Sequence, residues 1–148
     1  TLAMNQQSVS QSFVILLTVV GPLVEEVMKA AATLWAAEKR PFFFKSSTQI
    51  LICMAFSGLC FAVIENILYL NFYIPNPANW TIIWRWTVCV ALHTGCTLIT
   101  GVGISKMWRH AMTTRTRPRL PVAAPYMFAA FVVHGVYNFL ALFMELGS

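Results

Sequence analysis

The stretch Gly21-Pro-Leu-Val-Glu-Glu-Val-Met-Lys29 places two adjacent carboxylates and one ammonium group inside an apolar segment of about residues 13–37. An apolar segment of about 20 residues can cross a bilayer as a helix. Ionisable side chains at that depth cost about 2.5–3.5 kcal/mol each even on lenient scales, so they are rare and mark working sites. The stretch therefore predicts a membrane helix that carries part of a functional site.

Three further apolar segments, at about residues 50–73, 84–104 and 124–146, are also long enough to span a membrane. The chain has 148 residues, of which 58% are hydrophobic and 10% charged, whereas about a quarter of the residues are charged in a typical soluble domain. We therefore predict an all-α polytopic membrane protein. It would be a bundle of about four transmembrane helices around a buried polar site, with residues 1–148 forming a single integral membrane domain. The Gln/Ser-rich residues 1–12 are expected to be flexible.

Each of these three segments carries polar groups of the kind that catalysis uses. They are Glu65 with Asn66, His93, and His134 with Asn138. At about 1.5 Å of rise per residue, these groups and the paired glutamates fall in one band near the middle of the membrane. His134 and Asn138 are four residues apart and so share a helix face. The sequence thus predicts one chamber to which all four helices contribute.

Two basic residues lie inside the apolar segments. Lys29 follows Glu25 by four residues, the spacing of an i,i+4 ion pair. We expect this pair to neutralise one carboxylate in a supporting role and to leave the other glutamate free to titrate. Arg85 lies near the outer end of its segment, and we expect it to extend to the membrane interface rather than join the site.

The candidate residues suit hydrolysis by an activated water. Glu25 or Glu26 could act as a general base that deprotonates a water for attack on an amide. A histidine could hold that water or protonate the leaving amine, and Asn138 is suited to stabilise the oxyanion. The sequence contains no aspartate, so a Ser-His-Asp triad is excluded.

A zinc site is the alternative to a site without a cofactor. His93, His134 and Glu65 would supply two imidazoles and a carboxylate, leaving one open position on Zn²⁺ and the paired glutamates as base. The sequence has no H-E-x-x-H motif, and each ligand would come from a different helix. We favour a site with no cofactor and keep Zn²⁺ as the alternative.

Four short motifs in order resemble those of a known group. They are Glu25-Glu26-Val-Met-Lys29, Phe61-Ala-Val-Ile-Glu65-Asn66-Ile-Leu-Tyr69, His93 with Thr97 and Gly101, and His134-Gly-Val-Tyr137-Asn138-Phe. Together they resemble the PrsW family of intramembrane proteases, relatives of the CAAX-prenyl and bacteriocin-processing membrane proteases. The resemblance implies cleavage of membrane-anchored proteins, such as outward-side clipping of an anti-sigma factor. It also implies an essential acid at Glu25 or Glu26, with Glu65, His93 and His134 completing the site.

The resemblance also marks two differences. CAAX-prenyl proteases have a histidine where this chain has Glu65, and their basic residue lies further from the paired glutamates than Lys29 does, so prenylated proteins are the less expected substrates. PrsW proteins usually carry further helices before the paired glutamates. We therefore expect this chain to be either a piece of a longer protein or a minimal member.

Most of the net charge of +5 gathers on two loops. Eight of the ten basic residues fall there: Lys39, Arg40, Lys45, Lys106, Arg109, Arg115, Arg117 and Arg119. The positive-inside bias predicts that these loops are cytoplasmic. Both termini would then lie outside, and we expect the protein to be in the cell membrane. Because the basic residues flank membrane segments, we expect contact with the lipid bilayer and no nucleic-acid partner.

Two other functions use the same residues. A transporter or channel could line its ion path with these carboxylates and histidines, and a non-catalytic homologue could bind single-span proteins without cutting them. A proton path would tolerate Glu→Asp at several positions, whereas a protease should lose nearly all activity on Glu→Gln at the paired glutamates.

Overall fold

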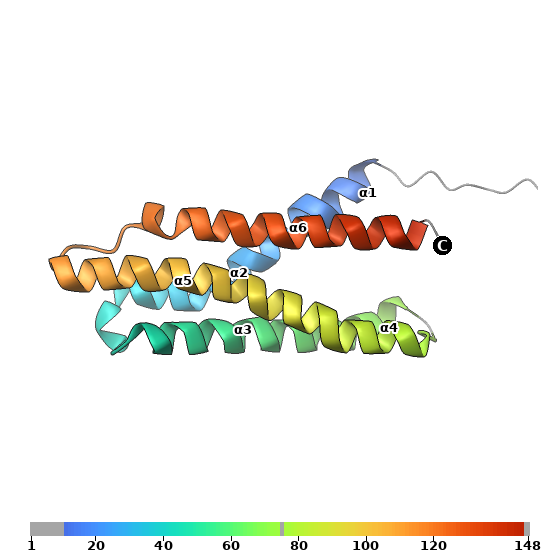
Figure 1. Cartoon of the computed structure of the whole chain (residues 1–148), viewed down its shortest axis with the longest axis horizontal. Helices are drawn as coiled ribbons and strands as arrows, with labels where there is room; N and C mark the ends of the chain where they lie inside the picture. Colours follow the sequence, from blue (N-terminus) through green and yellow to red (C-terminus); the bar gives the residue numbers. More distant parts are fainter. Residues whose placement is uncertain (1–10, 75, 147–148) are drawn as a thin grey trace, which may run out of the picture.

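The computed structural model describes residues 11–74 and 76–146, and the regular structure within them is entirely helical. The helices form four long continuous stretches, here called rods, that pack against one another (Figure 1). The first consists of α1 (Gln11–Ile15), the π-helical η1 (Leu16–Val20) and α2 (Gly21–Lys39); the second consists of α3 (Ser47–Leu68) and the π-helical η3 (Tyr69–Tyr73). The third consists of α4 (Asn79–Trp84), the π-helical η4 (Arg85–Cys89) and α5 (Val90–Thr114), and the fourth is α6 (Ala124–Leu146). The predicted all-α bundle is confirmed.

Three of the described helices are long and apolar enough to cross a membrane: Ser47–Tyr73, Asn79–Thr114 and Ala124–Phe143. The first rod is also continuous and carries the two glutamates and Lys29 in its middle. Of residues 1–12, expected to be flexible, residues 1–10 lie outside the described residues. Gln11 and Ser12 begin α1.

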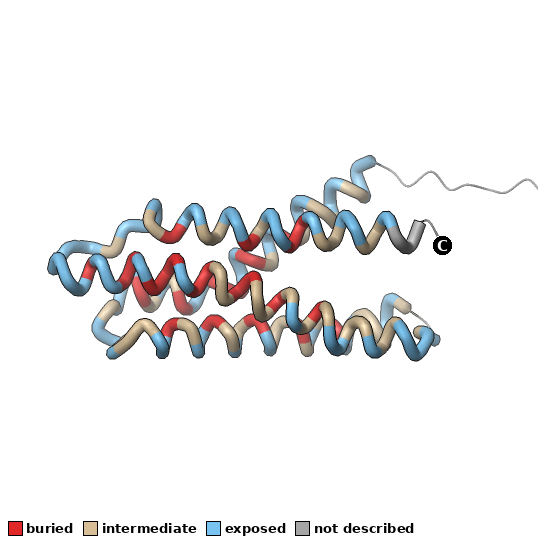
Figure 2. The backbone as a smooth tube through the Cα atoms, in the orientation of Figure 1, coloured by how far each residue is buried: buried red, intermediate tan, exposed pale blue. Residues whose placement is uncertain are grey.

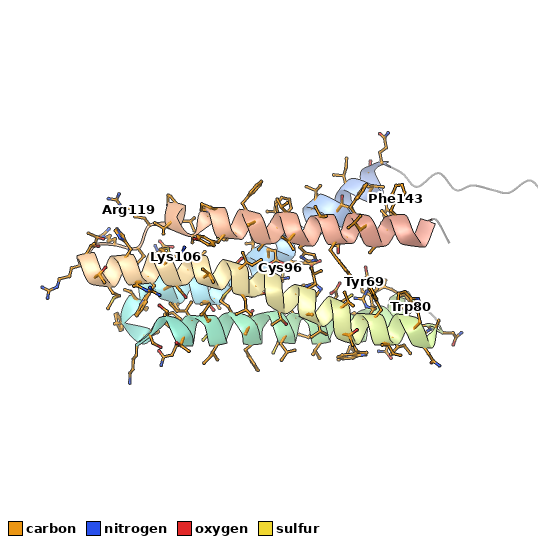
Figure 3. All side chains as sticks on the ribbon, viewed as in Figure 1. Tyr69, Trp80, Cys96, Lys106, Arg119 and Phe143 are labelled. Atoms are coloured by element: carbon orange, nitrogen blue, oxygen red, sulfur yellow. The ribbon has the colours of Figure 1, made fainter. Side chains whose placement is uncertain are left out.

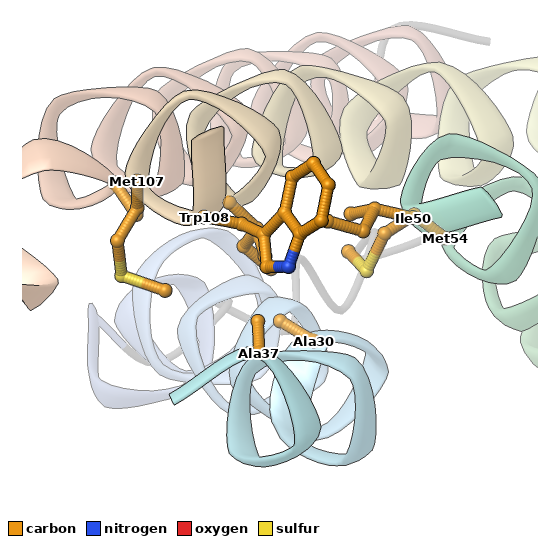
Figure 4. Packing of buried hydrophobic residues seen from close by; sticks show 8 residues of the cluster. Ala30, Ala37, Ile50, Met54, Met107 and Trp108 are labelled. Atoms are coloured by element: carbon orange, nitrogen blue, oxygen red, sulfur yellow. The ribbon is translucent and has the colours of Figure 1, made fainter. Parts of the chain in front are cut away.

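The third rod extends past its predicted boundary of about residue 104 and ends at Thr114. Its last turns continue because one of their faces is buried, with Met107, Trp108 and Ala111 at most 8% exposed. Met107 and Trp108 pack with Ala30, Ala37, Ile50 and Met54 (Figure 4). The Trp108 indole N–H also donates to the carbonyl of Pro41 at 2.7 Å. Lys106 and Arg109, predicted to lie in a loop, are on the exposed face of this helix.

The bundle is apolar outside and buries ionisable groups inside, beside the apolar cluster of Met107 and Trp108. Phe56, Phe72 and Phe128 are each at least 65% exposed, whereas Glu26 and His93 are each 3% exposed. The buried positions concentrate on the sides of the helices that face one another (Figure 2). This pattern suits a lipid environment, where buried ionisable groups face the bundle interior.

Close approaches between helices set the position of the site. At Gly58 on α3, an added Cβ would lie 2.6 Å from Thr97 Oγ1 and 2.9 Å from the carbonyl of His93. At Gly135 on α6, it would lie 2.5 Å from the carbonyl of Thr18 in η1. Small residues permit such contacts between membrane helices, and both glycines lie beside predicted site residues.

The two ends of the bundle differ in chemistry. The end of α2, the start of α3, the end of α5 and the start of α6 lie together at one end (Figure 1). This end, which we call the basic end, carries eight basic residues: Lys39, Arg40, Lys45, Lys106, Arg109, Arg115, Arg117 and Arg119. Figure 3 shows Lys106 and Arg119 there, with Trp80 and Phe143 toward the opposite end.

Candidate active site

Glu26 lies at the centre of a cluster of polar side chains that come from α2, α3, α5 and α6. Its Oε1 atom accepts a hydrogen bond from Lys29 Nζ at 2.6 Å and lies 2.8 Å from His134 Nδ1 on α6. The predicted pair between Lys29 and Glu25 is therefore wrong. Glu26 and Lys29 lie on the buried face of α2 with Pro22 and Thr33, whereas Glu25 is one position around the helix and lies to one side of the ammonium group.

His93 contacts charged groups through both ring nitrogens. Lys29 Nζ lies 3.1 Å from its Nδ1, and Glu65 Oε2 lies 2.6 Å from its Nε2. An ammonium group can only donate, so Nδ1 accepts and the ring proton is on Nε2, where it faces the Glu65 carboxylate. The ring also packs edge-to-face on that of His134, with centroids 4.8 Å apart. The tautomer and orientation of His93 are thus both specified by its neighbours.

Glu25 differs from the other two carboxylates in its neighbours: Glu26 and Glu65 each lie within 4.0 Å of a Lys or Arg nitrogen, whereas Glu25 has none among the described residues. The Oε2 atoms of all three glutamates are buried without a hydrogen-bond partner, and that of Glu25 lies 3.6 Å from His134 Nε2 and 4.0 Å from His93 Nδ1. Since an ionised Glu26 can only accept, Nδ1 of His134 donates to it, and Nε2 presents a lone pair. A carboxylate oxygen and an imidazole lone pair therefore face each other, and both are acceptors. The Glu25 side chain is 24% exposed, so it is also accessible.

Arg85 belongs to the cluster, so the prediction that it would not join the site is wrong. Its side chain is 13% exposed, and its Nη2 lies 3.5 Å from Glu65 Oε1. Its Nε donates to Asn66 Oδ1 at 3.1 Å. The sequence held a signal for this contact: three buried carboxylates need more positive charge nearby than Lys29 alone supplies.

Asn138 lies one turn beyond His134 on α6, but its side chain reaches a different element. Its Nδ2 donates to the backbone carbonyl of Leu17 in η1 at 3.1 Å. In an α-helix that carbonyl would accept from Gly21, whose N–H instead reaches Leu16. The residue one further along, Pro22, has no N–H to donate. Asn138 therefore satisfies a carbonyl that the helix itself cannot.

The structure thus brings Glu25, Glu26, Lys29, Glu65, His93 and His134 into one network of contacts. Asn66 supports it through Arg85. The network draws on all four rods, as the common depth of these residues predicted. Asn138 is joined to the first rod rather than to this network. The catalytic roles of these residues stay predictions.

Three of the residues could hold a metal ion by type and spacing. Ligand atoms of Glu25, His93 and His134 all lie within 4.8 Å of one another. The predicted zinc ligands were the two histidines with Glu65, but Glu25 is the carboxylate grouped with both. Glu25 Oε2 and His134 Nε2 have lone pairs free for a metal, whereas Nδ1 of His93 already accepts from Lys29. As these side chains are arranged, the three-residue set does not fit a metal unless Lys29 leaves His93.

One known protein family matches this chain. Residues 1–148 match the model of a family described as PrsW family intramembrane metalloprotease. No match was found among curated proteins or among solved structures. The family match confirms the resemblance of the four motifs and, with the apolar helices, makes the chain an integral membrane protein of a peptidase family. The chain belongs to the PrsW family of intramembrane metalloproteases.

Proposed function

We propose that this protein hydrolyses a peptide bond of a membrane-anchored protein, with Glu25 as the general base that activates a water. The observation that carries the proposal is the buried, unpartnered Oε2 of Glu25, 3.6 Å from Nε2 of His134. Two acceptors so placed suit a molecule that donates two hydrogens, as water does. A water held by both would have an oxygen lone pair available for attack.

The charges around the site support Glu25 rather than Glu26 as the base. Glu26 is paired with Lys29 at 2.6 Å, and Glu65 is paired with Arg85 at 3.5 Å. Glu25 has no Lys or Arg nitrogen within 4.0 Å among the described residues, and the groups 3.6 and 4.0 Å from its Oε2 are the two neutral imidazoles. A base must have a lone pair free for the incoming proton. Oε2 of each of the three glutamates offers one, so the absence of a neighbouring ammonium or guanidinium group is what favours Glu25.

The reaction balances with these residues. The water oxygen forms a bond to the peptide carbonyl carbon while Glu25 takes one water proton. The C–N bond then breaks, and the proton passes to the leaving amine, either from Glu25 or through His134. Glu26 keeps His134 in the required orientation by accepting from its Nδ1, as the third group of a triad orients its base.

The family description implies a metal, which when bound would act as a Lewis acid on the carbonyl or the water. Glu25 and His134 would hold it, joined by His93 if Lys29 left that ring. Because Lys29 occupies Nδ1 of His93, we favour the mechanism without a metal. Zn²⁺ is the alternative that a chelator tests.

We propose a membrane-anchored protein as substrate, cut on the outward side, with an anti-sigma factor as the example that the family resemblance implies. Eight basic residues at one end of the bundle support a cytoplasmic position for that end. Both termini would then face outward from the cell membrane. We also propose that residues 1–148 act as a single membrane domain.

The experiment uses the 148-residue chain, purified in detergent and incubated with a single-span protein tagged at both ends. Wild type should produce two fragments, and in H₂¹⁸O one ¹⁸O atom should enter the new C-terminal carboxylate. Glu25→Gln/Glu26→Gln should produce none, whereas Glu38→Gln, an exposed glutamate paired with Lys39, should cut like wild type. Identical fragment patterns from wild type and the double variant would exclude this enzyme function. If the wild-type protein and Glu38→Gln also fail to cut the tagged protein, a transport or binding role gains support.

A further inference from the structure

We propose that Arg85 is a positioning residue of the site: acting through Glu65, it holds the imidazole of His93 in the tautomer and orientation that the reaction needs. The part of this inference that concerns turnover rests on the function proposed above. The part that concerns the ring of His93 rests on geometry alone.

The distribution of basic residues singles out Arg85. Of the ten Lys and Arg residues in the sequence, eight lie at the basic end. The other two, Lys29 and Arg85, each lie within ion-pair distance of a site carboxylate. An arginine that served as an interfacial anchor would extend its guanidinium to water, but the side chain of Arg85 is 13% exposed.

Contacts on several sides hold the guanidinium of Arg85 in place. Nε donates to Asn66 Oδ1 at 3.1 Å, and Asn66 Nδ2 donates back to the carbonyl of Arg85 at 2.9 Å. The guanidinium carbon lies 3.8 Å from the centroid of the Tyr69 ring, a cation–π distance. Asn66 is fully buried, so this reciprocal pair is a fixed support from which Nη2 reaches Glu65.

Glu65 transmits this constraint to the site because its two oxygens have different partners. Oε1 lies 3.5 Å from Arg85 Nη2, and Oε2 lies 2.6 Å from His93 Nε2. With Oε1 held, Oε2 stays against Nε2 and favours the proton there, which leaves Nδ1 to accept from Lys29 at 3.1 Å. Without Arg85, Glu65 would have no cation beside it and could turn away from the ring.

Arginine suits this role better than lysine. Its planar fork can reach Asn66 through Nε and Glu65 through Nη2 at the same time, whereas an ammonium group is a single point of charge. Arg85→Lys should therefore keep part of the effect. Arg85→Gln, which removes the charge, should lose all of it.

The test is a double-mutant cycle on cleavage of the tagged single-span protein by the 148-residue chain in detergent. Arg85→Gln should lower kcat by about 10- to 100-fold, the scale of the loss when a partner that orients a metal-ligating histidine is removed. KM should change by less than about twofold, since substrate binding is untouched. Arg85→Lys should recover part of kcat, and Arg117→Gln, which removes an exposed arginine of the basic end, should match wild type. In a Glu65→Gln background, Arg85→Gln should reduce kcat no further, because its effect passes through Glu65.

The same variants are compared by ¹⁵N NMR of histidine-labelled protein in liposomes, with His93 assigned from a His93→Gln sample. Wild type should show the Nε2-protonated ring, and Arg85→Gln should show a second tautomer or a broadened signal. An unchanged His93 signal in Arg85→Gln, or a full second loss of kcat in the double variant, would overturn the proposal. If wild type does not cut at all, the proposed function fails, while the NMR comparison still decides whether Arg85 positions the ring.

Discussion

Oε1 of Glu26 lies 2.8 Å from Nδ1 of His134, a contact between residues 108 positions apart in the chain. It joins the first rod to the last and makes the two adjacent glutamates unequal. Glu26 also binds Lys29 and is 3% exposed, whereas the Glu25 side chain is 24% exposed and has no Lys or Arg nitrogen of the described residues within 4.0 Å. Substitutions at the two positions should therefore have different effects.

Glu26→Gln should destabilise the protein. It leaves the ammonium of Lys29 buried without its anion, and breaking a buried pair in this way costs about 3–5 kcal/mol. Thermal unfolding in detergent should show a melting temperature several degrees lower, while Glu38→Gln should show none of this shift. Adding Lys29→Met to Glu26→Gln should recover much of the lost stability. If the double variant melts no higher than Glu26→Gln, the pair does not stabilise the bundle in this way.

Gly58→Ala should separate α3 from α5. The new methyl group would lie 2.6 Å from Thr97 Oγ1 and 3.0 Å from the Cα of Thr94, and overpacking of this kind costs about 1–3 kcal/mol. Gly95→Ala is the matched control because nothing lies within 4 Å of its added Cβ. Melting temperatures should fall for the first variant and stay level or rise for the second. Equal effects would show that the helices are not this close at Gly58.

Asn138→Ala should lower stability as well as activity, because it leaves the carbonyl of Leu17 without a donor. A side-chain hydrogen bond between membrane helices contributes about 0.6 kcal/mol on average and at most about 1.7. Asn71→Ala is the control, since Asn71 donates to the carbonyl of Ile67 from an exposed position. If Asn138→Ala melts like wild type yet loses activity, Asn138 acts on the reaction instead, as the oxyanion role predicts.

Removal of metal should leave cleavage nearly unchanged. Lys29 already donates to Nδ1 of His93, so the mechanism assigns no step to a bound ion. Dialysis against a strong chelator, followed by the cleavage assay, should give a rate within about twofold of the untreated protein, a change too small to reflect loss of a transition-state contact. A rate that collapses and returns on addition of Zn²⁺ would support the zinc alternative at Glu25, His93 and His134.

The sequence predicted the bundle well because each rod contains an apolar segment long enough to cross a membrane. It also predicted that polar groups at a common depth would meet, since helix rise fixes depth. Boundaries were less accurate where a helix continues beyond the apolar run, as α5 does to Thr114 because Met107 and Trp108 are buried there.

Pairings inside the site could not be derived from spacing. Lys29 is three residues from Glu26 and four from Glu25, and both spacings allow an ion pair. Which pair forms depends on the face of α2 that meets His93 and His134, a tertiary property. Arg85 was misassigned for a similar reason: its distance from the membrane surface could be counted, but its contact with Glu65 on another helix could not.

The most direct test of the central claim is the single-turnover cleavage rate of Glu25→Gln, measured beside its melting temperature and that of Glu38→Gln. If Glu25 is the base, the rate should fall by about 10²- to 10⁴-fold, the contribution of a positioned general base. The melting temperature should stay level, because Glu25 Oε2 has no hydrogen-bond partner to lose. A Glu25→Gln protein that melts like wild type and cuts at a comparable rate would contradict the account.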